Sequence, residues 1–283
     1  MRASKSLLIL LLLCPALWGF GQSALVLAQQ HYKAGRYDES ISAASVAIGE
    51  DADPEAYFCR ANAHHKLGHF TEAVEDYDRA RINGFSGDEL YLHRGICKIS
   101  LMTYDAARID LMNHLENRPD DPITYYWLAT AEYMSMENKA SLRYLDEALA
   151  LDSSYADAYF LRAANMAELN RNNLAIDDFQ LALQYNPKLL RAKFHMAVLL
   201  IGMGQFENAV EMLSELQLEN VDFISEVLYY HGEALYYMHD LEGACADWKE
   251  SAQLGDRDAQ HNLKKVCGEK GKLKNKKKTY FAF

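Results

Sequence analysis

The sequence predicts an all-α fold built from one helical hairpin that is repeated along the chain. Small residues recur every 34 positions, at Gly95, Ala129, Ala163 and Ala197. Aromatic, leucine and arginine residues stand near each of them at matching offsets. A fixed period of this size is typical of stacked repeat proteins, in which each repeat contacts only its neighbours. Such proteins usually bind other chains, so the period also indicates a binding role.

The clearest copy, residues 157–187, reads as two amphipathic helices joined by a turn. Its first half places apolar and small residues at helical spacing: Tyr159, Arg162, Ala163 and Met166. Turn-forming residues follow from Asn170 to Asn173, and Pro187 ends the copy. The second half carries another stripe at the same spacing: Ala175, Ile176, Phe179, Ala182 and Leu183.

This pattern resembles the tetratricopeptide repeat, whose motif runs from an aromatic residue through Leu-Gly and Tyr to Ala, Phe, Ala and Pro. Matching residues recur in the other copies: Tyr57, Ala61, Gly68, Ala73, Tyr77 and Ala80; Tyr91, Gly95, Ala107, Leu111 and Pro119; Tyr125, Leu128, Ala129, Leu145 and Ala148; Met196, Ala197, Gly204, Ala209 and Leu213. The first and last copies match more loosely. Three positions depart from the motif, Ser40 and Ser141 at helical alanines and Leu216 at the last one.

The resemblance implies a right-handed superhelical solenoid of about seven hairpins with a C-terminal cap helix. The repeats are expected at about 21–53, 54–87, 88–121, 122–155, 156–189, 190–223 and 225–258. The cap is expected over 259–268, within a final helix from about Arg257 to Cys267. An irregular helical bundle is the alternative, but chance does not keep a register over this length.

The first 21 residues have the layout of a secretory signal peptide. Arg2 and Lys5 precede an apolar run from Leu7 to Leu13, which is shorter than the roughly 20 residues of a membrane span. Cleavage is expected after Gly21, with Ser23 or Ala28 as alternative ends. We therefore expect an exported protein with no transmembrane segment in its mature form.

Charge is distributed unevenly along the chain. The chain carries 29 basic and 40 acidic residues, a net charge of −11. Residues 269–283 hold six lysines and one glutamate, a net charge of +5, and the leader holds two basic residues, so residues 22–268 carry −18. An acidic body of this kind disfavours nucleic acid as a partner. The lysine-rich tail is expected to be disordered, and either makes a peripheral contact with an anionic partner or folds back on the body.

Two cysteines are expected to lie at the same end of neighbouring helices. Cys245 falls early in the second helix of the seventh repeat, and Cys267 late in a final helix that would pack antiparallel to it. In an oxidising compartment this placement favours a disulfide, with two buried free thiols as the alternative. Cys59 and Cys97 are expected to be lone thiols in the core.

The resemblance also implies a binding groove on the concave face, lined by the first helix of each hairpin. Its expected residues are mostly aromatic: Tyr32, Phe58, His65, Leu92, Tyr126, Tyr133, Phe160, Phe194, Tyr229 and Tyr236. Such rings would suit a protein or peptide with apolar side chains. Rings packed between repeats with only their edges exposed are the alternative. Relatives that hold chaperone tails use basic residues here, whereas this chain has Phe58 and Leu92, and only Asn62 matches.

No motif indicates catalysis, a metal or a cofactor. His64 and His65 are adjacent and point about 100° apart on a helix, so they cannot easily share one ion. Nucleotide-binding and nucleophile motifs are absent from the sequence. We expect a non-catalytic scaffold, in the periplasm or else outside the cell or on its outer surface, with a role in envelope assembly or secretion. An enzyme subunit with an unrecognised site and a luminal co-chaperone are the alternatives.

Overall fold

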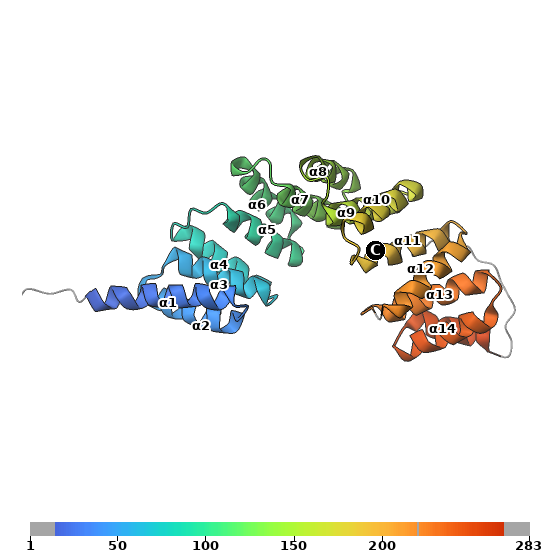
Figure 1. The fold of residues 1–283 in the computed structure, drawn as a ribbon. Helices are drawn as coiled ribbons and strands as arrows, with labels where there is room; N and C mark the ends of the chain where they lie inside the picture. Colours follow the sequence, from blue (N-terminus) through green and yellow to red (C-terminus); the bar gives the residue numbers. More distant parts are fainter. Residues whose placement is uncertain (1–14, 220, 269–283) are drawn as a thin grey trace, which may run out of the picture. The chain divides into compact units, whose positions relative to one another are not determined.

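A computed structural model describes residues 15–219 and 221–268, with side chains from residue 24 onward except residue 50. These residues form fifteen α-helices and one π-helical turn, and no strand (Figure 1). The expected lysine-rich tail and the apolar run of the leader lie outside the described residues. The first helix is continuous from Pro15 to Lys33, through the expected cleavage point after Gly21.

Fourteen of the helices form seven successive hairpins, which confirms the predicted all-α repeat array. The hairpins are α1 (Pro15–Lys33) with α2 (Tyr37–Asp51), α3 (Pro54–Lys66) with α4 (Phe70–Ile82), α5 (Glu89–Ser100) with α6 (Tyr104–Asn117), α7 (Pro122–Met134) with α8 (Asn138–Leu151), α9 (Ala156–Glu168) with α10 (Asn172–Tyr185), α11 (Leu190–Gly202) with α12 (Phe206–Leu218), and α13 (Ile224–Tyr237) with α14 (Leu241–Gln253). The chain ends its described part with α15 (Arg257–Asn262) and η1 (Leu263–Cys267).

The hairpins group into two compact units, residues 1–120 with α1 to α6 and residues 121–283 with α7 to η1. Within each unit, every helix packs on the next one in the chain, and first helices also contact each other, as α3 does α5 and α7 does α9. Two helices begin slightly outside the expected repeat boundaries, α13 at Ile224 and α15 at Arg257.

The two helices of a hairpin cross where a small residue meets a large one. Gly95 faces Leu111, and a Cβ built on this glycine would lie 2.9 Å from Leu111 Cγ. Gly232 faces Trp248 in the same way, with 2.9 Å to the indole nitrogen. Contacts this short exclude a side chain, so glycine stands where the facing residue leaves no room. The 34-residue spacing of small residues is therefore the spacing of these crossings.

Serine replaces alanine at two crossings because its hydroxyl finds a partner there. Ser40 Oγ donates to the carbonyl of Ala28 at 2.9 Å, and Ser141 Oγ donates to the carbonyl of Ala129 at 2.8 Å. Both serines are fully buried. A buried hydroxyl that bonds a backbone carbonyl avoids the cost of an unpaired polar group. These departures from the repeat motif thus preserve the close approach of the helices.

Each hairpin turn contains one residue with positive φ. These residues are Gly35, Gly68, Met102, Met136, Asn170, Gly204 and His239. Glycine adopts this conformation without strain, whereas a methionine there has a Cβ that crowds its own backbone. The turn geometry therefore persists in hairpins whose sequence does not favour it.

One position of the first helix joins two second helices. In three hairpins it holds arginine, and in the last it holds histidine. Each of these side chains binds the residue 16 positions later, on its own second helix, and a residue on the preceding second helix. The contacts are Arg60 with Asp76 (2.7 Å) and Ser45 (2.9 Å), Arg94 with Asp110 (2.8 Å) and Asp78 (2.5 Å), Arg162 with Asp178 (2.7 Å) and Asp146 (2.8 Å), and His231 with Asp247 (2.6 Å) and Ser214 (3.0 Å). We call this the bridging position.

Two hairpins carry apolar residues at the bridging position and at its partner. Leu128 stands 16 residues before Tyr144, and Met196 stands 16 residues before Met212. The chain therefore never places a carboxylate at the partner position of an apolar bridging residue. Asp110 and Asp178 are 2% and 5% exposed, and such a buried carboxylate without a cation would be strongly destabilising.

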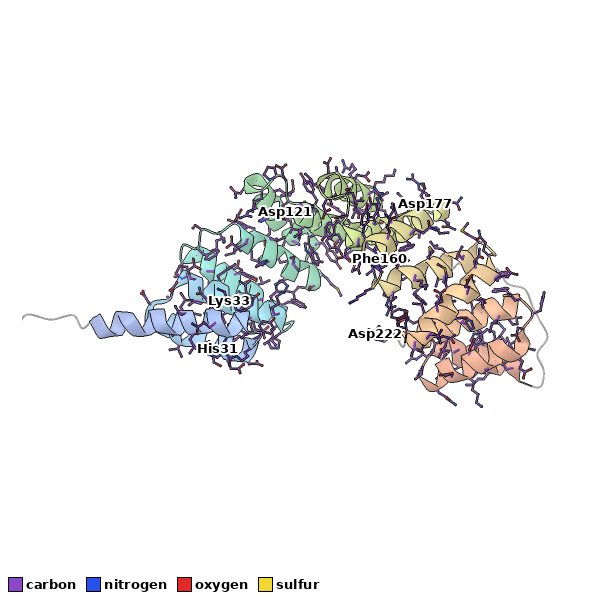
Figure 2. The ribbon with its side chains drawn as sticks, viewed as in Figure 1. His31, Lys33, Asp121, Phe160, Asp177 and Asp222 are labelled. Carbon is purple, nitrogen blue, oxygen red and sulfur yellow. A yellow bond between two sulfur atoms is a disulfide. The ribbon has the colours of Figure 1, made fainter. Side chains whose placement is uncertain are left out.

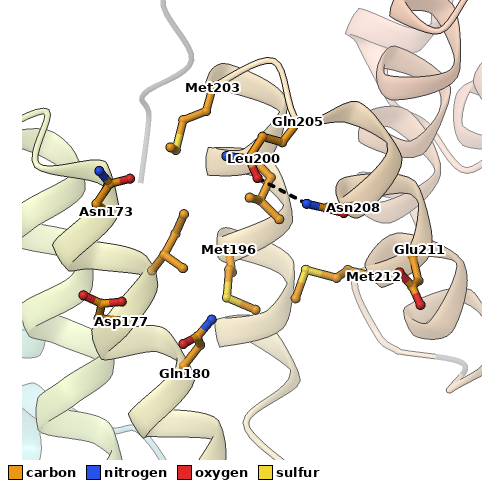
Figure 3. A pocket seen from close by; sticks show the side chains of 11 residues that line it. Asn173, Asp177, Gln180, Met196, Leu200, Met203, Gln205, Asn208, Glu211 and Met212 are labelled. Carbon is orange, nitrogen blue, oxygen red and sulfur yellow. Dashed lines mark hydrogen bonds between the residues drawn. The ribbon is translucent and has the colours of Figure 1, made fainter.

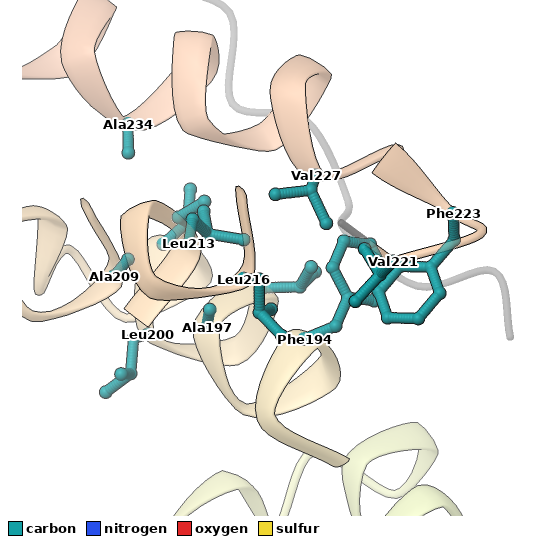
Figure 4. Packing of buried hydrophobic residues seen from close by; sticks show 12 residues of the cluster. Phe194, Ala197, Leu200, Ala209, Leu213, Leu216, Val221, Phe223, Val227 and Ala234 are labelled. Atoms are coloured by element: carbon teal, nitrogen blue, oxygen red, sulfur yellow. The ribbon is translucent and has the colours of Figure 1, made fainter. Parts of the chain in front are cut away.

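The sixth hairpin has the largest described core, and the connection after it contributes to that core (Figure 4). Leu216, which replaces a helical alanine, is fully buried there. Val221 and Phe223, between α12 and α13, pack with Phe194 and Val227 in the same cluster. The connection thus acts as a core element and covers one end of α11.

A disulfide joins the last helical segment to the seventh hairpin. Cys245 on α14 is bonded to Cys267 at the end of η1, with 5.9 Å between their Cα atoms. This is the pair that the sequence analysis favoured over two free thiols. Cys59 and Cys97 are free and buried, and burial raises the pKa of the Cys97 thiol to about 12.

Replacing Arg162 by leucine should lower the free energy of unfolding by roughly 3–5 kcal/mol, because the Asp178 carboxylate would stay buried without its cation. The double variant Arg162→Leu with Asp178→Tyr copies the Leu128 and Tyr144 pair and should recover most of that loss. Denaturant unfolding followed by circular dichroism measures both.

The matched control is Arg108→Leu, which removes an ion pair with Asp105, a side chain that is 93% exposed. Exposed pairs contribute about 1 kcal/mol or less, so this variant should unfold near the wild type. Equal losses for Arg162→Leu and Arg108→Leu would contradict the role of the bridging position.

Replacing both Cys245 and Cys267 by serine should destabilise the last hairpin by about 3 kcal/mol, because the disulfide closes a loop between residues 22 positions apart. Thermal unfolding with and without reductant measures the effect, which should disappear in the double variant. Mass spectrometry of the unreduced protein that finds both thiols free would rule out the bond.

Candidate functional site

The expected groove residues all lie on first helices, except that the structure buries two of them. Eight are half-buried: Tyr32, Phe58, His65, Leu92, Tyr126, Tyr133, Phe160 and Tyr236. Phe194 and Tyr229 are only 2% and 7% exposed. We call the eight half-buried residues the first-helix face. They fall into two sets, one in each compact unit.

In the first unit the face is centred on Phe58 of α3. Its ring stacks on Phe85 at 4.2 Å between centroids and on His93 of α5 at 6.0 Å. His65 lies 6.2 Å from the same His93 ring. Asn62, the residue that matched the chaperone-tail motif, accepts hydrogen bonds from Tyr77 Oη (2.6 Å) and His93 Nδ1 (2.9 Å). Its side chain is therefore already engaged inside the protein.

In the second unit the face is formed by α7 and α9. Tyr126 lies 5.2 Å from the ring of Tyr155, and Phe160 lies 5.6 Å from the ring of His195 on α11. Tyr133 Oη donates to Glu168 Oε1 of α9 at 2.7 Å. Figure 2 labels Phe160 on the α9 side of its hairpin and Asp177 on the α10 side. Each ring of the face thus packs on a neighbouring element and keeps part of its surface open.

Phe194 and Tyr229 do not offer open rings, for two different reasons. Phe194 is covered by Phe223 of the connection at 5.5 Å and by Tyr230 of α13 at 5.6 Å. Tyr229 lies in a cluster with Trp248 and Ala259, where the final helical segment packs in place of a further repeat. For these two positions the alternative of rings packed between repeats describes the structure.

Two histidines belong to this face although the sequence analysis did not select them. His93 and His195 stand one residue after Leu92 and Phe194, so a comparison of the next column of the repeats would have found them. Burial lowers the pKa of each imidazole to about 4. Both are therefore neutral rings near pH 7 and add aromatic surface without charge.

A cavity of about 490 Å³ lies on the other side of the second unit, among α10, α11 and α12 (Figure 3). We call it the outer cavity. Its lining is apolar at the centre and polar at the rim: Asn173, Ile176, Asp177, Gln180, Met196, Leu200, Met203, Gln205, Asn208, Glu211 and Met212. None of these side chains is basic.

The outer cavity lies at the one bridging position of the second unit that holds methionine. Met196, Met212 and Gln180 occupy the places of the arginine and its two carboxylate partners in the ion-paired hairpins. A guanidinium at residue 196 would reach into this space and join α10 to α12, as Arg162 joins α8 to α10. The cavity thus exists because an ion-paired bridge is missing from this hairpin.

The bridging position of the last hairpin has the residue types of a hydrolase triad. Ser214 Oγ lies 3.0 Å from His231 Nε2, and His231 Nδ1 lies 2.6 Å from Asp247 Oδ2. These three residues take the places of the preceding partner, the bridging arginine and the following carboxylate in the other hairpins. None of them lines the cavity described above. The arrangement is thereby accounted for as a helix-joining contact, and the sequence analysis had treated His231 only as a candidate metal ligand.

Neither a metal centre nor a membrane span emerges from the described residues. No group of three histidine, cysteine or acidic side chains in that part of the chain is placed to hold a metal ion. None of the helices from residue 15 to 268 combines the length and the hydropathy that crossing a bilayer requires.

Comparisons with known proteins agree with the repeat geometry. Tetratricopeptide repeat family models match residues 54–82 and 166–229. RNA polymerase II-associated protein 3 of Rattus norvegicus is 34% identical over 106 residues. That match covers 35% of this chain and 16% of the length of the relative.

Solved structures show the same fold at low sequence identity. A tetratricopeptide repeat protein of Parabacteroides merdae has a TM-score of 0.68 at 13% identity, covering 87% of this chain and 98% of its own. The pilF protein of Pseudomonas aeruginosa has a TM-score of 0.60 at 13% identity, covering 72% and 94%. MamA of Desulfovibrio magneticus has a TM-score of 0.55 at 16% identity, covering 60% and 96%. The helical hairpins, their crossings and the matching family models together identify the chain as a tetratricopeptide repeat protein.

Proposed function

We propose that this protein is a non-catalytic scaffold that binds an apolar segment of a partner on the first-helix face. The observation that carries the proposal is the set of partly open aromatic rings, Phe58 in one unit and Tyr126 and Phe160 in the other. The tetratricopeptide fold is generally an interaction module, which is consistent with this role.

The face has no charge with which to select an ionic partner. His93 and His195 are neutral at pH 7, and burial raises the pKa of Tyr126 further above neutrality. Arginines of the first helices, such as Arg162, are held by carboxylates at the bridging position. A partner would therefore be selected by apolar and aromatic side chains, with little dependence on salt.

The rings of the face are already fixed by their neighbours. Phe58 is held between Phe85 and His93, and Phe160 against His195. A ring that is ordered before binding loses little conformational freedom when a partner covers it, so more of the contact energy remains as affinity. This arrangement supports a binding role for side chains that also stabilise the repeats.

The proposal places the protein outside the cytoplasm, in the periplasm or beyond, where it would serve envelope assembly or secretion. Two observations support export. The apolar run from Leu7 to Leu13 follows two basic residues, as in a signal peptide, and Cys245 and Cys267 form a disulfide. Disulfides persist in oxidising compartments and are rare in the cytosol.

Replacing Tyr126 and Phe160 by alanine should weaken peptide binding by roughly tenfold or more, as expected for removing two aromatic contacts. Peptides selected on the wild-type protein by display, then measured by fluorescence anisotropy, provide the readout. The selected sequences should be rich in aromatic and aliphatic residues.

The control is Leu174→Ala with Leu218→Ala, which removes two apolar side chains that are 50% and 87% exposed on second helices. This pair should leave affinity unchanged. Equal affinities for the Tyr126 and Phe160 variant and the wild type would remove the first-helix face from consideration.

If the protein is exported as proposed, the mature chain isolated from its native cell should begin at Gln22. N-terminal sequencing together with intact mass measures this directly, and it also gives the redox state of Cys245 and Cys267. A chain that retains Met1 in the cytoplasmic fraction would contradict export and leave the binding proposal standing.

A further inference from the structure

We propose that the lysine-rich segment of this chain, residues 269–283, binds in the outer cavity. Its aromatic residues, Tyr280, Phe281 and Phe283, would enter the apolar centre, and its lysines would lie along the acidic rim. The cavity is then a peptide-binding site for a basic and aromatic sequence, filled by the chain itself. This site is separate from the first-helix face and does not depend on the function proposed for that face.

The centre of the cavity suits an aromatic side chain. Met196, Met203 and Met212 line it together with Leu200 and Ile176 (Figure 3). Methionine adapts to the shape of a ligand and makes favourable contacts between its sulfur and aromatic rings. The volume of about 490 Å³ falls within the roughly 300–1,000 Å³ of pockets that hold small ligands. Such a space accepts one or two rings of the segment.

The rim of the cavity has the opposite charge to the segment. Asp177 and Glu211 are both exposed there, and no basic residue lines the site. Residues 269–283 carry six lysines and one glutamate, whereas residues 22–268 carry a net charge of −18. Since lysines precede the aromatic residues in the segment, rings in the centre leave the ammonium groups near the rim. Attraction of this kind favours the outer cavity over the uncharged first-helix face.

The segment starts close enough to reach the cavity. The disulfide fixes Cys267 to α14, which packs on α13, and α13 packs on α12 beside the cavity. Packed helices lie about 8–10 Å apart, so two such steps cover about 20 Å. Residues 268–283 can span about 50 Å when extended, which also allows for movement along the helices. A tether of this length keeps the segment at an effective concentration on the order of millimolar.

The test is photo-crosslinking in the full chain with Phe281 replaced by p-benzoylphenylalanine, followed by peptide mapping. We expect crosslinks within one chain to Met196, Met203 or Met212. Mixing chains of two isotopic compositions separates crosslinks within a chain from those between chains. Crosslinks to the first-helix face, crosslinks between two copies, or no crosslinks at all would overturn the proposal.

Closing the cavity supplies the second part of the test. Met196→Arg with Met212→Asp rebuilds the pair that Arg162 and Asp178 form in the preceding hairpin, so the fold should be kept while the space is filled. Crosslinks to α11 and α12 should then be lost, with the thermal midpoint close to that of the wild type. Crosslinks that persist at these helices in the folded variant would contradict the proposal.

A rim variant makes the test independent of whether the closed-cavity variant folds. Asp177→Lys with Glu211→Lys should strongly reduce the crosslinks, because it replaces attraction at the rim by repulsion. The matched control is Glu207→Lys with Glu250→Lys, which makes the same change of charge at exposed positions of α12 and α14 outside the cavity. Equal reductions in the two variants would show general attraction to the acidic body, and would overturn the assignment to this site.

Discussion

The crossing of a small residue against a large one, 16 positions later, is the contact on which the rest of this structure depends. Gly95 against Leu111 and Gly232 against Trp248 bring the two helices of a hairpin so close that no side chain fits between them. Once this distance is set, the residue before the small one always faces two second helices. The bridging position is therefore a consequence of the crossing, and it repeats with the same period.

At the bridging position the chain uses either an ionic or an apolar solution, and the choice determines the outer surface. An arginine such as Arg162 fills the space between neighbouring second helices and binds a carboxylate on each. Methionine at residue 196 cannot make those bonds, and its facing residue is methionine as well. Shorter reach and lost hydrogen bonds leave a space there, which is the outer cavity. A buried carboxylate at residue 212 would have been costly, so the two substitutions belong together.

The sequence was sufficient for the hairpins because their crossings and turns are local and periodic. It was insufficient for Phe194, whose burial comes from Phe223 in a connection that does not follow the 34-residue repeat. It was also insufficient for Tyr229, because the covering cluster includes residues of the final helical segment. His93 and His195 were missed since histidine suggests metal binding or solvent, and only packing shows that they are neutral rings. The outer cavity requires three columns of the repeat, 16 positions apart, to be read together.

Helix α11 links the two proposed binding surfaces because it is apolar on nearly every side. Phe194 and Ala197 belong to the core shared with α12 and α13, whereas Met196 and Leu200 line the outer cavity. A helix of this kind is buried all round, so its orientation is fixed by packing on both sides. The two surfaces differ in charge, since the first-helix face presents neutral rings and the outer cavity has an acidic rim. A segment rich in lysine is therefore drawn to the cavity, and the first-helix face stays open to an uncharged partner.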